Sequence, residues 1–269
     1  MSIHPNELMT QNQRAWNEVA ARHAEHNLDE TKSRMATGEA AYLDPVFRRH
    51  MTDREIADKI VVQLNCNNGR ELLSVLQLGA RNGVGFDFSA EFIQQAQDIA
   101  TVCDVDAEFV ESNVYDIPSR FDGFADIVFV TVGALCWMPD LAKYFNVARR
   151  ILKPGGELVV YETHPFLEMF KLDRDREPGE EIKMHYPYFS SEPFVSTAGL
   201  DYYGDEKYGE EITYWYHYNL TDIIGAVISS DFRITVFEEF EHELDSGYRE
   251  LLSLEVRPPM TFIVVADKN

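Results

Sequence analysis

The sequence has few cysteines, little positive charge and no long apolar run. Its three cysteines are odd in number and include no Cys-x-x-Cys pair. This excludes a disulfide scaffold and favours a reducing compartment, so we expect a cytoplasmic protein. No stretch approaches the ~18 consecutive apolar residues of a transmembrane helix. The N-terminal residues also lack the basic start and apolar run of a secretory signal.

Basic residues are scarce: 24 Lys and Arg stand against 46 Asp and Glu, for a formal net charge of −22. Such a field repels phosphate, so the composition argues against nucleic acid and anionic membrane surfaces as partners. Apolar residues are plentiful, at 45% of the 269 residues. They suffice for the core of one large α/β domain, which we expect to span residues 1–269 as a monomer or homodimer.

Strand-like and helix-like segments alternate over residues 56–162. The strand-like segments are continuous runs of β-branched and apolar residues, which is typical of parallel strands buried on both faces. After residue 219 a helix and two strands follow, and these would close the sheet as an antiparallel pair. The predicted fold class is α/β, with a doubly wound, mostly parallel, Rossmann-like sheet of seven strands.

Two regions lie outside this pattern. The N-terminal region reads as a helical cap with an apolar face at Trp16, Val19 and Ala20. An insertion follows the fifth strand, and its residues 186–218 include 11 aromatic residues in 33, against 12% in the whole chain. Long loops of this kind are usually functional, and we expect a lid. The alternative is that these rings form a small satellite core or a dimer interface, without acceptor contact. The predicted parts of the domain are residues 1–50 (cap), 51–165 (cofactor-binding core), 166–218 (lid) and 219–269 (closing helix and strand pair).

The first strand–helix turn is where an open α/β sheet binds its ligand, and here it reads "NCNNG", residues 65–69. A dinucleotide fingerprint needs three glycines, and only Gly69 is present. An NAD-dependent enzyme is therefore disfavoured. Asparagine is the non-glycine residue that best tolerates a left-handed backbone, so the turn can keep its shape. An ordinary surface turn is the alternative.

Asp87 ends the second strand, where an acid accepts hydrogen bonds from a ribose diol. The alternative role for Asp87 is to cap the next helix. Ser89 is better placed for that role, which would leave Asp87 free.

Three further motifs complete a pattern. They read "AEFVESNVYDIP", "ADIVFVTVGALCWMPDL" and "ARRILKPGGELVVYETHP". With the first turn, they resemble class I S-adenosylmethionine-dependent methyltransferases, and more closely a small-molecule subgroup with an "NNG" loop and "E-x-HP" after the fifth strand. The resemblance covers roughly residues 10–267. "LKPGG" is its most specific signal: the helix would end at Lys153, and Gly155–Gly156 would turn into the strand.

The resemblance implies a methyltransferase that uses S-adenosyl-L-methionine, releases S-adenosyl-L-homocysteine and methylates a small molecule. Asn113 and Gln63 stand where many members carry an acid, although an asparagine can still accept through its carbonyl oxygen. The implied cofactor contacts are Asn65, Cys66, Asn67 and Gly69 in the turn, Gln63 before it, Asp87 at the ribose, Phe88, Asn113 and Val114 at the adenine, and Thr131 and Val132, with the residues up to Ala134, near the methyl group.

Methyl transfer depends mainly on positioning, so we expect no metal site. His164 and His217 are candidate bases for an acceptor proton, with packing as the alternative role of each. His23 and His26 are expected to be exposed on the N-terminal helix. Trp215 and Tyr188 are expected to contact the acceptor. Two other functions stay open: a different use of the same cofactor, and a binding protein of this fold without the chemistry.

Overall fold

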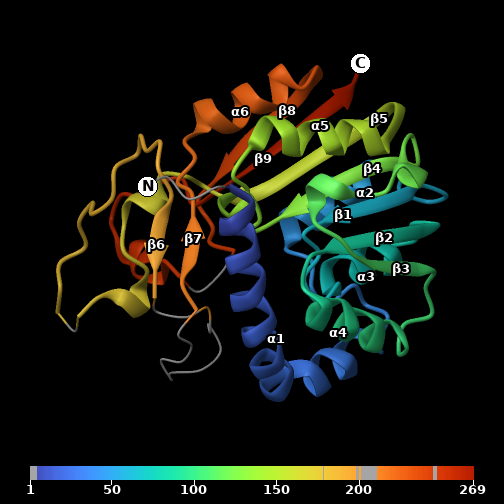
Figure 1. The fold of residues 1–269 in the computed structure, drawn as a ribbon, viewed down its shortest axis with the longest axis horizontal. Coiled ribbons are helices and arrows are strands. Elements are labelled where there is room, and N and C mark those ends of the chain that lie inside the picture. Colours follow the sequence, from blue (N-terminus) through green and yellow to red (C-terminus); the bar gives the residue numbers. More distant parts are fainter. Residues whose placement is uncertain (1–4, 178, 198–199, 201–210, 245–246) are drawn as a thin grey trace.

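The computed structural model describes residues 5–177, 179–197, 200, 211–244 and 247–269. A seven-stranded sheet with the order β3-β2-β1-β4-β5-β9-β8 forms its centre (Figure 1). The five strands from β3 to β5 are parallel, and β9 runs antiparallel between β5 and β8. The predicted α/β, mostly parallel seven-stranded fold is confirmed. The strands are β1 (Ile60–Leu64), β2 (Asn82–Asp87), β3 (Ala107–Glu111), β4 (Ala125–Thr131), β5 (Leu152–Thr163), β8 (Phe232–Phe240) and β9 (Thr261–Lys268).

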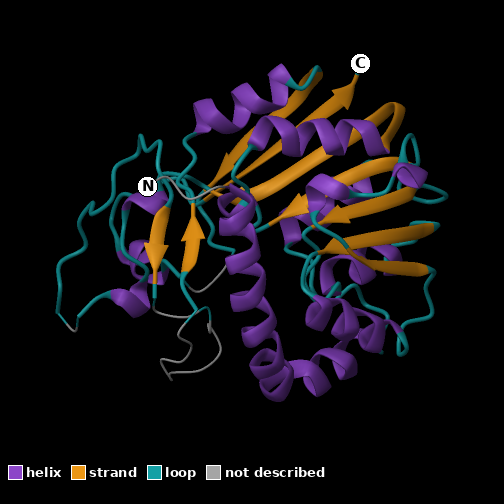
Figure 2. Ribbon diagram, in the orientation of Figure 1, coloured by secondary structure: helices purple, strands orange, loops and turns teal. Residues whose placement is uncertain are grey.

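Helices cover both faces of this sheet (Figure 2). One hydrophobic cluster joins the sheet to α5 and α6, and a second joins the opposite face to α2, α3 and α4. Every residue of β1 is buried, as a strand covered on both faces should be. The helices are α1 (Pro5–Met35), α2 (Pro45–Asp53), α3 (Arg70–Gln77), α4 (Ala90–Ala100), α5 (Leu141–Ile151) and α6 (Leu220–Ser229).

Capping side chains fix where these helices begin. Ser89 is the N-cap of α4, with its Oγ 3.3 Å from the amide of Phe92 that donates to it. Asp140 caps α5 in the same way. Asn219 and Asp222 form a reciprocal capping box at α6. Each cap satisfies amides that the first helical turn leaves without partners, so the chain enters each helix at a defined residue.

The "LKPGG" turn begins earlier than predicted. α5 ends at Ile151 rather than at Lys153, and Leu152 already pairs with Ala125 of β4. The reason is Pro154, because a residue that precedes proline is disfavoured in the helical conformation. Gly155 then adopts a left-handed backbone with φ of 73°, which makes the predicted turn into the long part of β5.

The insertion after β5 carries a small two-stranded sheet of its own, β6 (Phe194–Ser196) with β7 (Thr213–Trp215). Part of the predicted lid, residues 198–199 and 201–210 with three of its tyrosines, lies outside the described residues. The 20-residue connection between β8 and β9 packs against the start of the insertion. Their shared hydrophobic cluster contains Leu167, Tyr248, Leu251 and Met260. We call the insertion (166–218) and this connection (241–260) the cover segments.

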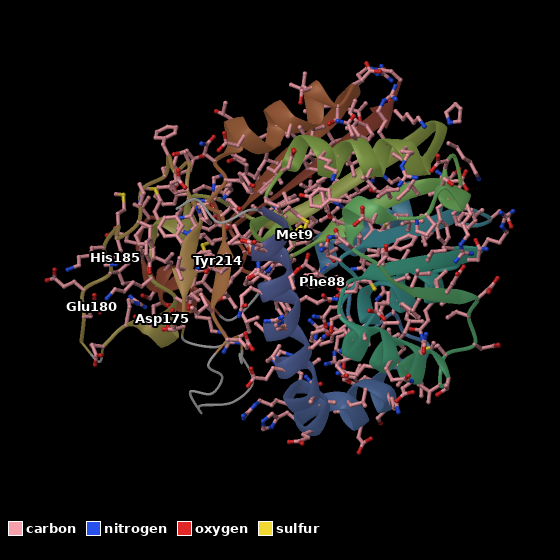
Figure 3. The ribbon with its side chains drawn as sticks, viewed as in Figure 1. Met9, Phe88, Asp175, Glu180, His185 and Tyr214 are labelled. Atoms are coloured by element: carbon pink, nitrogen blue, oxygen red, sulfur yellow. The ribbon has the colours of Figure 1, made fainter. Side chains whose placement is uncertain are left out.

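Helix α1 stands between the main sheet and the insertion (Figures 1 and 3). On one side, Asn12 exchanges two hydrogen bonds with the backbone of Tyr214 in β7, at 2.7 and 2.8 Å. On the other side, Gln13 donates to the carbonyl of Phe88, just after β2. The helix therefore ties the insertion to the carboxyl edge of the sheet.

The apolar face predicted for α1 is confirmed. Val19 and Ala20 are buried against Phe92 of α4, with Trp16 packed beside them. The expectation that His23 is exposed was wrong, because it lies on the same face and is buried, whereas His26 is exposed as expected. Since α1 packs against both α4 and β7, an exposed position on this helix could not be told from a buried one by periodicity along a single face.

Candidate active site

A cavity of about 890 Å³ opens at the carboxyl ends of β1, β2, β4 and β5. It is the place where an open α/β sheet binds its ligand. The cavity brings together residues from the sheet edge, from α1 and from both cover segments. Seven of the predicted cofactor residues line it: Gln63, Asn65, Asn67, Asp87, Phe88, Thr131 and Val132.

The first turn has the backbone of a glycine-rich loop without most of the glycines. Asn65 and Asn67 have φ of 55° and 51°, and Gly69 has φ of 73°. These are left-handed conformations, which asparagine tolerates best among residues with a side chain. The Oδ1 of Asn65 accepts a 2.9 Å hydrogen bond from the hydroxyl of Tyr144. The predicted turn geometry is therefore present, and a partner from α5 fixes it.

Glycine is required at the end of this turn for reasons of space. A Cβ on Gly69, the N-cap of α3, would lie 2.4 Å from the ring of Phe109 in β3. Gly69 and Cys66 do not line the cavity. Cys66 is buried beneath the turn, and its amide donates to the carbonyl of Phe86. Burial, and then the charge of Asp87, raise the pKa of the Cys66 thiol well above its usual value, so this thiol is a packing group.

Asp87 has two roles at the tip of β2. Its Oδ2 accepts from the amide of Asn67 at 2.8 Å, and its Oδ1 accepts from the amide of Ser89 at 2.9 Å. Ser89 is indeed the cap of α4, yet Asp87 is not left free, because it joins the first turn to the second. Each carboxylate oxygen retains a further lone pair that a ribose hydroxyl can use. Burial raises the pKa of Asp87 to about 6, and the backbone hydrogen bonds oppose that rise.

Gln63 supplies a polar group that lacks a partner among the described residues. Its Nε2 donates to Thr131 Oγ1 at 2.8 Å, while its buried Oε1 accepts no hydrogen bond there. A buried oxygen without a donor costs free energy, so it indicates a ligand with N–H groups. The ammonium of S-adenosylmethionine has this chemistry. Gln63, the asparagine turn and Asp87 would thus hold its amino acid and ribose parts, and the residues present fit the cofactor.

Asn113 and Val114 do not line the cavity. Val114 belongs to the hydrophobic core, and the Oδ1 of Asn113 accepts from the amide of Tyr115, which caps a short helical turn. Their predicted contact with adenine stays a prediction. Aromatic rings from Trp16, Phe92 and Trp137 line the cavity instead. Trp16 lies edge-on to Trp137 at 5.3 Å between ring centroids, and 5.9 Å from Phe92.

Neither candidate histidine lines the cavity. Both ring nitrogens of His164 have partners: Nε2 lies 2.9 Å from Glu239, and Nδ1 accepts from the amide of Phe166. His217 is buried with its ring stacked on Phe194 at 4.0 Å. Burial lowers the pKa of His217 to about 4, and the Pro187 backbone opposes this. The geometry supports a structural role for His164. His217 packs among aromatic rings, but both of its buried ring nitrogens lack a hydrogen-bond partner among the described residues, so its role as a base stays a prediction.

Glu162 is a site residue to which the sequence assigned no role. It lines the cavity and accepts four backbone hydrogen bonds, from Gly133, Ala134, Leu135 and Thr163, at 2.6 to 3.3 Å. Burial raises its pKa to about 7 against these four bonds. It holds the loop after β4, whose residues Val132 to Leu135 form one wall of the cavity. The sequence feature that could have identified Glu162 as a site residue is its position as the first residue of "E-x-HP".

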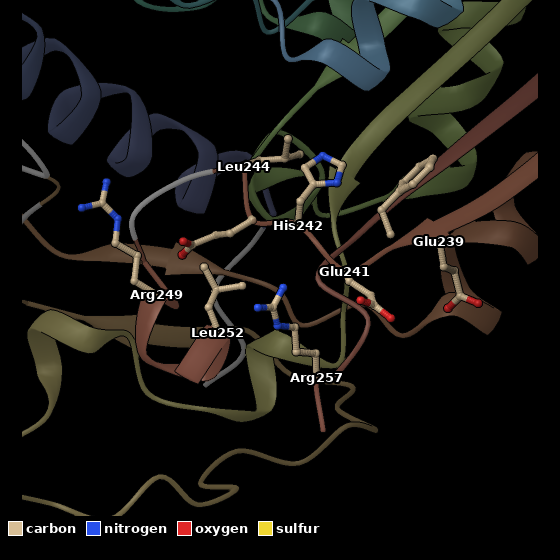
Figure 4. A pocket seen from close by; sticks show the side chains of 9 residues that line it. Glu239, Glu241, His242, Leu244, Arg249, Leu252 and Arg257 are labelled. Atoms are coloured by element: carbon tan, nitrogen blue, oxygen red, sulfur yellow. The ribbon is translucent and has the colours of Figure 1, made fainter. Parts of the chain in front are cut away.

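A second hollow, of about 910 Å³, lies at the end of β8 and along the β8–β9 connection (Figure 4). Leu244 borders both hollows. The outer one is lined by charged side chains of both signs and by no residue of the predicted site. Among the described residues, no group of three or more His, Cys, Asp or Glu is arranged to hold a metal ion. Within the same residues, no helix combines the length and apolar character that crossing a membrane requires.

Comparison with known proteins agrees with this geometry. Residues 62–160 match the model of a methyltransferase domain family. A methyltransferase from Penicillium fellutanum, phqN, is 28% identical over 105 residues, and a tRNA U34 carboxymethyltransferase from Nautilia profundicola is 30% identical over 105 residues. These matches cover 38% and 39% of this chain. They span only 32% and 34% of the two relatives, about a third of their length.

Solved structures resemble a larger part of the chain. A structure described as an S-adenosylmethionine-dependent methyltransferase from Listeria monocytogenes superposes with a TM-score of 0.59 at 21% identity. The match covers 82% of this chain and 97% of the Listeria chain. This likeness concerns the fold. Residues 62–160 thus match a methyltransferase domain family, within a chain whose fold resembles that of the Listeria structure.

Proposed function

We propose that this chain, with its methyltransferase domain and class I fold, is an S-adenosylmethionine-dependent methyltransferase that transfers a methyl group to a small molecule. The observation that carries the proposal is the single cavity shared by Gln63, the asparagine turn, Asp87 and the loop after β4. When bound, the cofactor supplies a methyl group on a sulfonium, which needs no metal to react. The protein's part is to hold the two reactants in line and exclude water.

Three groups of residues divide this work. The turn and Asp87 hold the cofactor from the sheet side. Glu162 ties down the loop after β4, because three of its backbone hydrogen bonds come from the loop residues Gly133, Ala134 and Leu135. Helix α1 and the cover segments enclose the remainder with Trp16, Tyr186 and Trp215, which supports the predicted lid.

A small acceptor fits this cavity better than an RNA. Aromatic side chains from the insertion line it, including Tyr186, Trp215, Tyr216 and Tyr218. A pocket enclosed by aromatic rings and a few polar groups is typical of small-molecule sites. The relative from Nautilia acts on tRNA by its name. Against this, the net charge of −22 opposes a polyphosphate partner.

Isothermal titration with S-adenosylmethionine, S-adenosylhomocysteine and NAD tests the cofactor assignment. The first two should bind and raise the melting temperature by mass action, and NAD should do neither. No heat and no thermal shift with millimolar S-adenosylmethionine would overturn the proposal. Binding without methyl transfer to any compound of a broad acceptor panel would favour a binding protein of this fold.

The lid is tested by a matched pair of variants. Trp215 lines the cavity, whereas Tyr188, which the sequence also suggested as an acceptor residue, does not line it. The hydroxyl of Tyr188 accepts instead from the amide of Leu220 at the start of α6. Trp215→Ala should impair acceptor binding while cofactor affinity stays nearly intact, and Tyr188→Ala should lower only the melting temperature. If both variants only lower the melting temperature or dissociate an oligomer, the lid is wrong and the insertion is structural.

A further inference from the structure

The cavity is strongly acidic. Six acidic side chains line it, from Asp44, Glu71, Asp87, Glu162, Glu168 and Asp175, and the basic residue among the described lining residues is Arg70. Clefts lined by one sign of charge concentrate ligands of the opposite sign. The cofactor itself accounts for part of this charge, because its sulfonium and ammonium are both positive.

Most of these acids already have partners. Asp87 and Glu162 accept backbone hydrogen bonds, as described above. Asp44 accepts from the hydroxyl of Tyr161 and caps α2, and Glu71 pairs with Arg70 at 2.9 Å. Asp175 is exposed to solvent. Glu168 differs from all of them: its Oε2 is buried, yet it accepts no hydrogen bond from a described residue.

The backbone around Glu168 holds it firmly in this position. It belongs to η4 (Leu167–Met169), the short helical turn that follows "E-x-HP". Leu167 is buried in the cluster that joins the two cover segments, and its amide donates to the carbonyl of His164. The carbonyl of Met169 accepts from the amides of His185 and Tyr186. These contacts fix the backbone that carries Glu168, and its side chain lines the cavity.

Glu168 lies close to the loop after β4, where the resemblance described above puts the methyl group of a bound cofactor. Its charge interacts with Glu162, which holds the loop after β4, and with Cys136 at the end of that loop. Aromatic and apolar side chains of the cover, including Tyr186 and Phe170, line the same cavity. An acceptor nitrogen between Glu168 and the methyl group would leave its apolar part against these rings.

We propose that the acceptor is a small amine with an apolar or aromatic body, and that Glu168 binds its nitrogen and takes its proton during methyl transfer. The proposal rests on the methyltransferase function proposed above. Before transfer, the carboxyl and the amine share one proton. That proton moves to Glu168, and the nitrogen lone pair forms a bond to the methyl carbon. The carbon–sulfur bond breaks, and its electron pair stays on sulfur.

The products are then the N-methylated ammonium, S-adenosylhomocysteine and one proton left on Glu168. Burial, and then the charge of Glu162, raise the pKa of the Glu168 carboxyl well above its usual value. A carboxyl of this kind accepts a proton near neutral pH more readily than an exposed glutamate does. No histidine lines the described cavity to take this role.

The chain carries its own probe for a test. Its three tryptophans, Trp16, Trp137 and Trp215, all line the cavity, so intrinsic fluorescence reports on occupancy. With S-adenosylhomocysteine present, the protein is titrated with 2-phenylethylamine, 2-phenylethanol and phenylacetate, which match in size but differ in charge. The amine should bind at least tenfold more tightly than the alcohol, and phenylacetate should not bind.

Glu168→Gln should lose at least tenfold in affinity for the amine and keep its affinity for the alcohol. The matched control is Glu181→Gln, which removes the same charge from an exposed position of the insertion and should behave as wild type. Melting curves check that both variants fold. Amine affinity unchanged in Glu168→Gln, or phenylacetate binding as tightly as the amine, would overturn this inference.

The two proposals fail separately in this experiment. If S-adenosylhomocysteine binds and the amine shows no preference, the acceptor inference is wrong and the methyltransferase proposal stands. If S-adenosylhomocysteine and S-adenosylmethionine do not bind, methyl transfer is wrong, even where the cavity prefers the amine through Glu168.

Discussion

Glu162 and Glu168 line the same cavity and lie close together in the sequence, but their surroundings are opposite. Glu162 comes from the end of β5 and accepts four backbone hydrogen bonds. Glu168 comes from the cover, and its buried Oε2 accepts none from a described residue. The same contrast separates the two regions. At the sheet edge, Asp87 and Asn65 are fixed by protein partners, whereas the cover presents rings and a carboxyl to the cavity.

The difference separates carboxylates that protein donors already satisfy from buried oxygens without a donor among the described residues, which include Glu168 Oε2 in the cover and Gln63 Oε1 at the sheet edge. At the sheet edge, Asp87 and Glu162 hold loops in place through hydrogen bonds to the protein, so binding of the proposed cofactor should require little rearrangement there. In the cover, an unsatisfied polar group raises the free energy of the empty protein and lowers that of a complex. Substitutions at the sheet edge should therefore cost stability, and substitutions in the cover should cost acceptor recognition.

The largest effect is expected from Glu162→Gln. At pH 8, above its pKa of about 7, Glu162 is ionised and serves four donors. A glutamine would turn an NH₂ group toward two of these donors, which would then be buried without an acceptor. We expect a loss of about 2–5 kcal/mol in the free energy of unfolding. Glu168→Gln should change it by less than about 1 kcal/mol, because no bond to a described residue is lost. Urea denaturation measures both, and equal costs would remove the distinction between the regions.

Asp87→Ala should have the next largest effect. It removes the proposed acceptor of the ribose and should weaken cofactor binding by about 1.5–3 kcal/mol. It should also lower stability, because the amides of Asn67 and Ser89 lose their partner. Ser89→Ala is the control: loss of a helix cap costs about 1 kcal/mol of stability and should leave affinity nearly unchanged. Calorimetric titration and thermal melting separate the two effects. Unaltered cofactor affinity in Asp87→Ala would mean that Asp87 only links the turn after β1 to the turn after β2.

Asn12→Ala should release the insertion from α1. Two hydrogen bonds to the backbone of Tyr214 disappear, each worth about 1 kcal/mol. The amides of β7 should exchange hydrogen faster, while those of β1 and β4 should not. Arg14→Ala, at an exposed position on the same helix, is the matched control. Exchange that rises equally in β7 and the main sheet would mean that the two regions unfold together.

The smallest expected effect concerns His217 and acid pH. Burial lowers its folded pKa from 6.5 to about 4. Between these values the unfolded chain binds a proton that the folded chain does not, so the free energy of unfolding falls as pH drops from 6.5 toward 4. His217→Phe keeps a ring against Phe194 and removes this term. The difference in melting temperature between variant and wild type should grow in favour of the variant over that window. A difference in melting temperature that does not change with pH would show that the pKa of His217 is the same in the folded and unfolded chains.

The sheet edge could be predicted from the sequence because its turn residues and strand ends depend on neighbouring residues alone. Asn65, Asn67 and Gly69 stand where left-handed residues are needed, and Asp87 ends an apolar run. Pro154 indicates that the helix before it must end, although α5 ends at Ile151, two residues earlier than predicted. Histidine roles could not be predicted, because His164 acquires its partner Glu239 from a strand far along the chain.

The sequence by itself determined the order of strands and helices, the turn at residues 65–69 and the methyltransferase-like core. Periodicity, caps and turn residues act over a few positions, so they can be read without a fold. Only the tertiary structure decided which side chains line the cavity. It turned Glu162 onto the loop after β4, left Glu168 facing the cavity and placed α1 between the sheet and β7. These contacts join segments that are distant in sequence, and their partners are set by packing rather than by neighbouring residues.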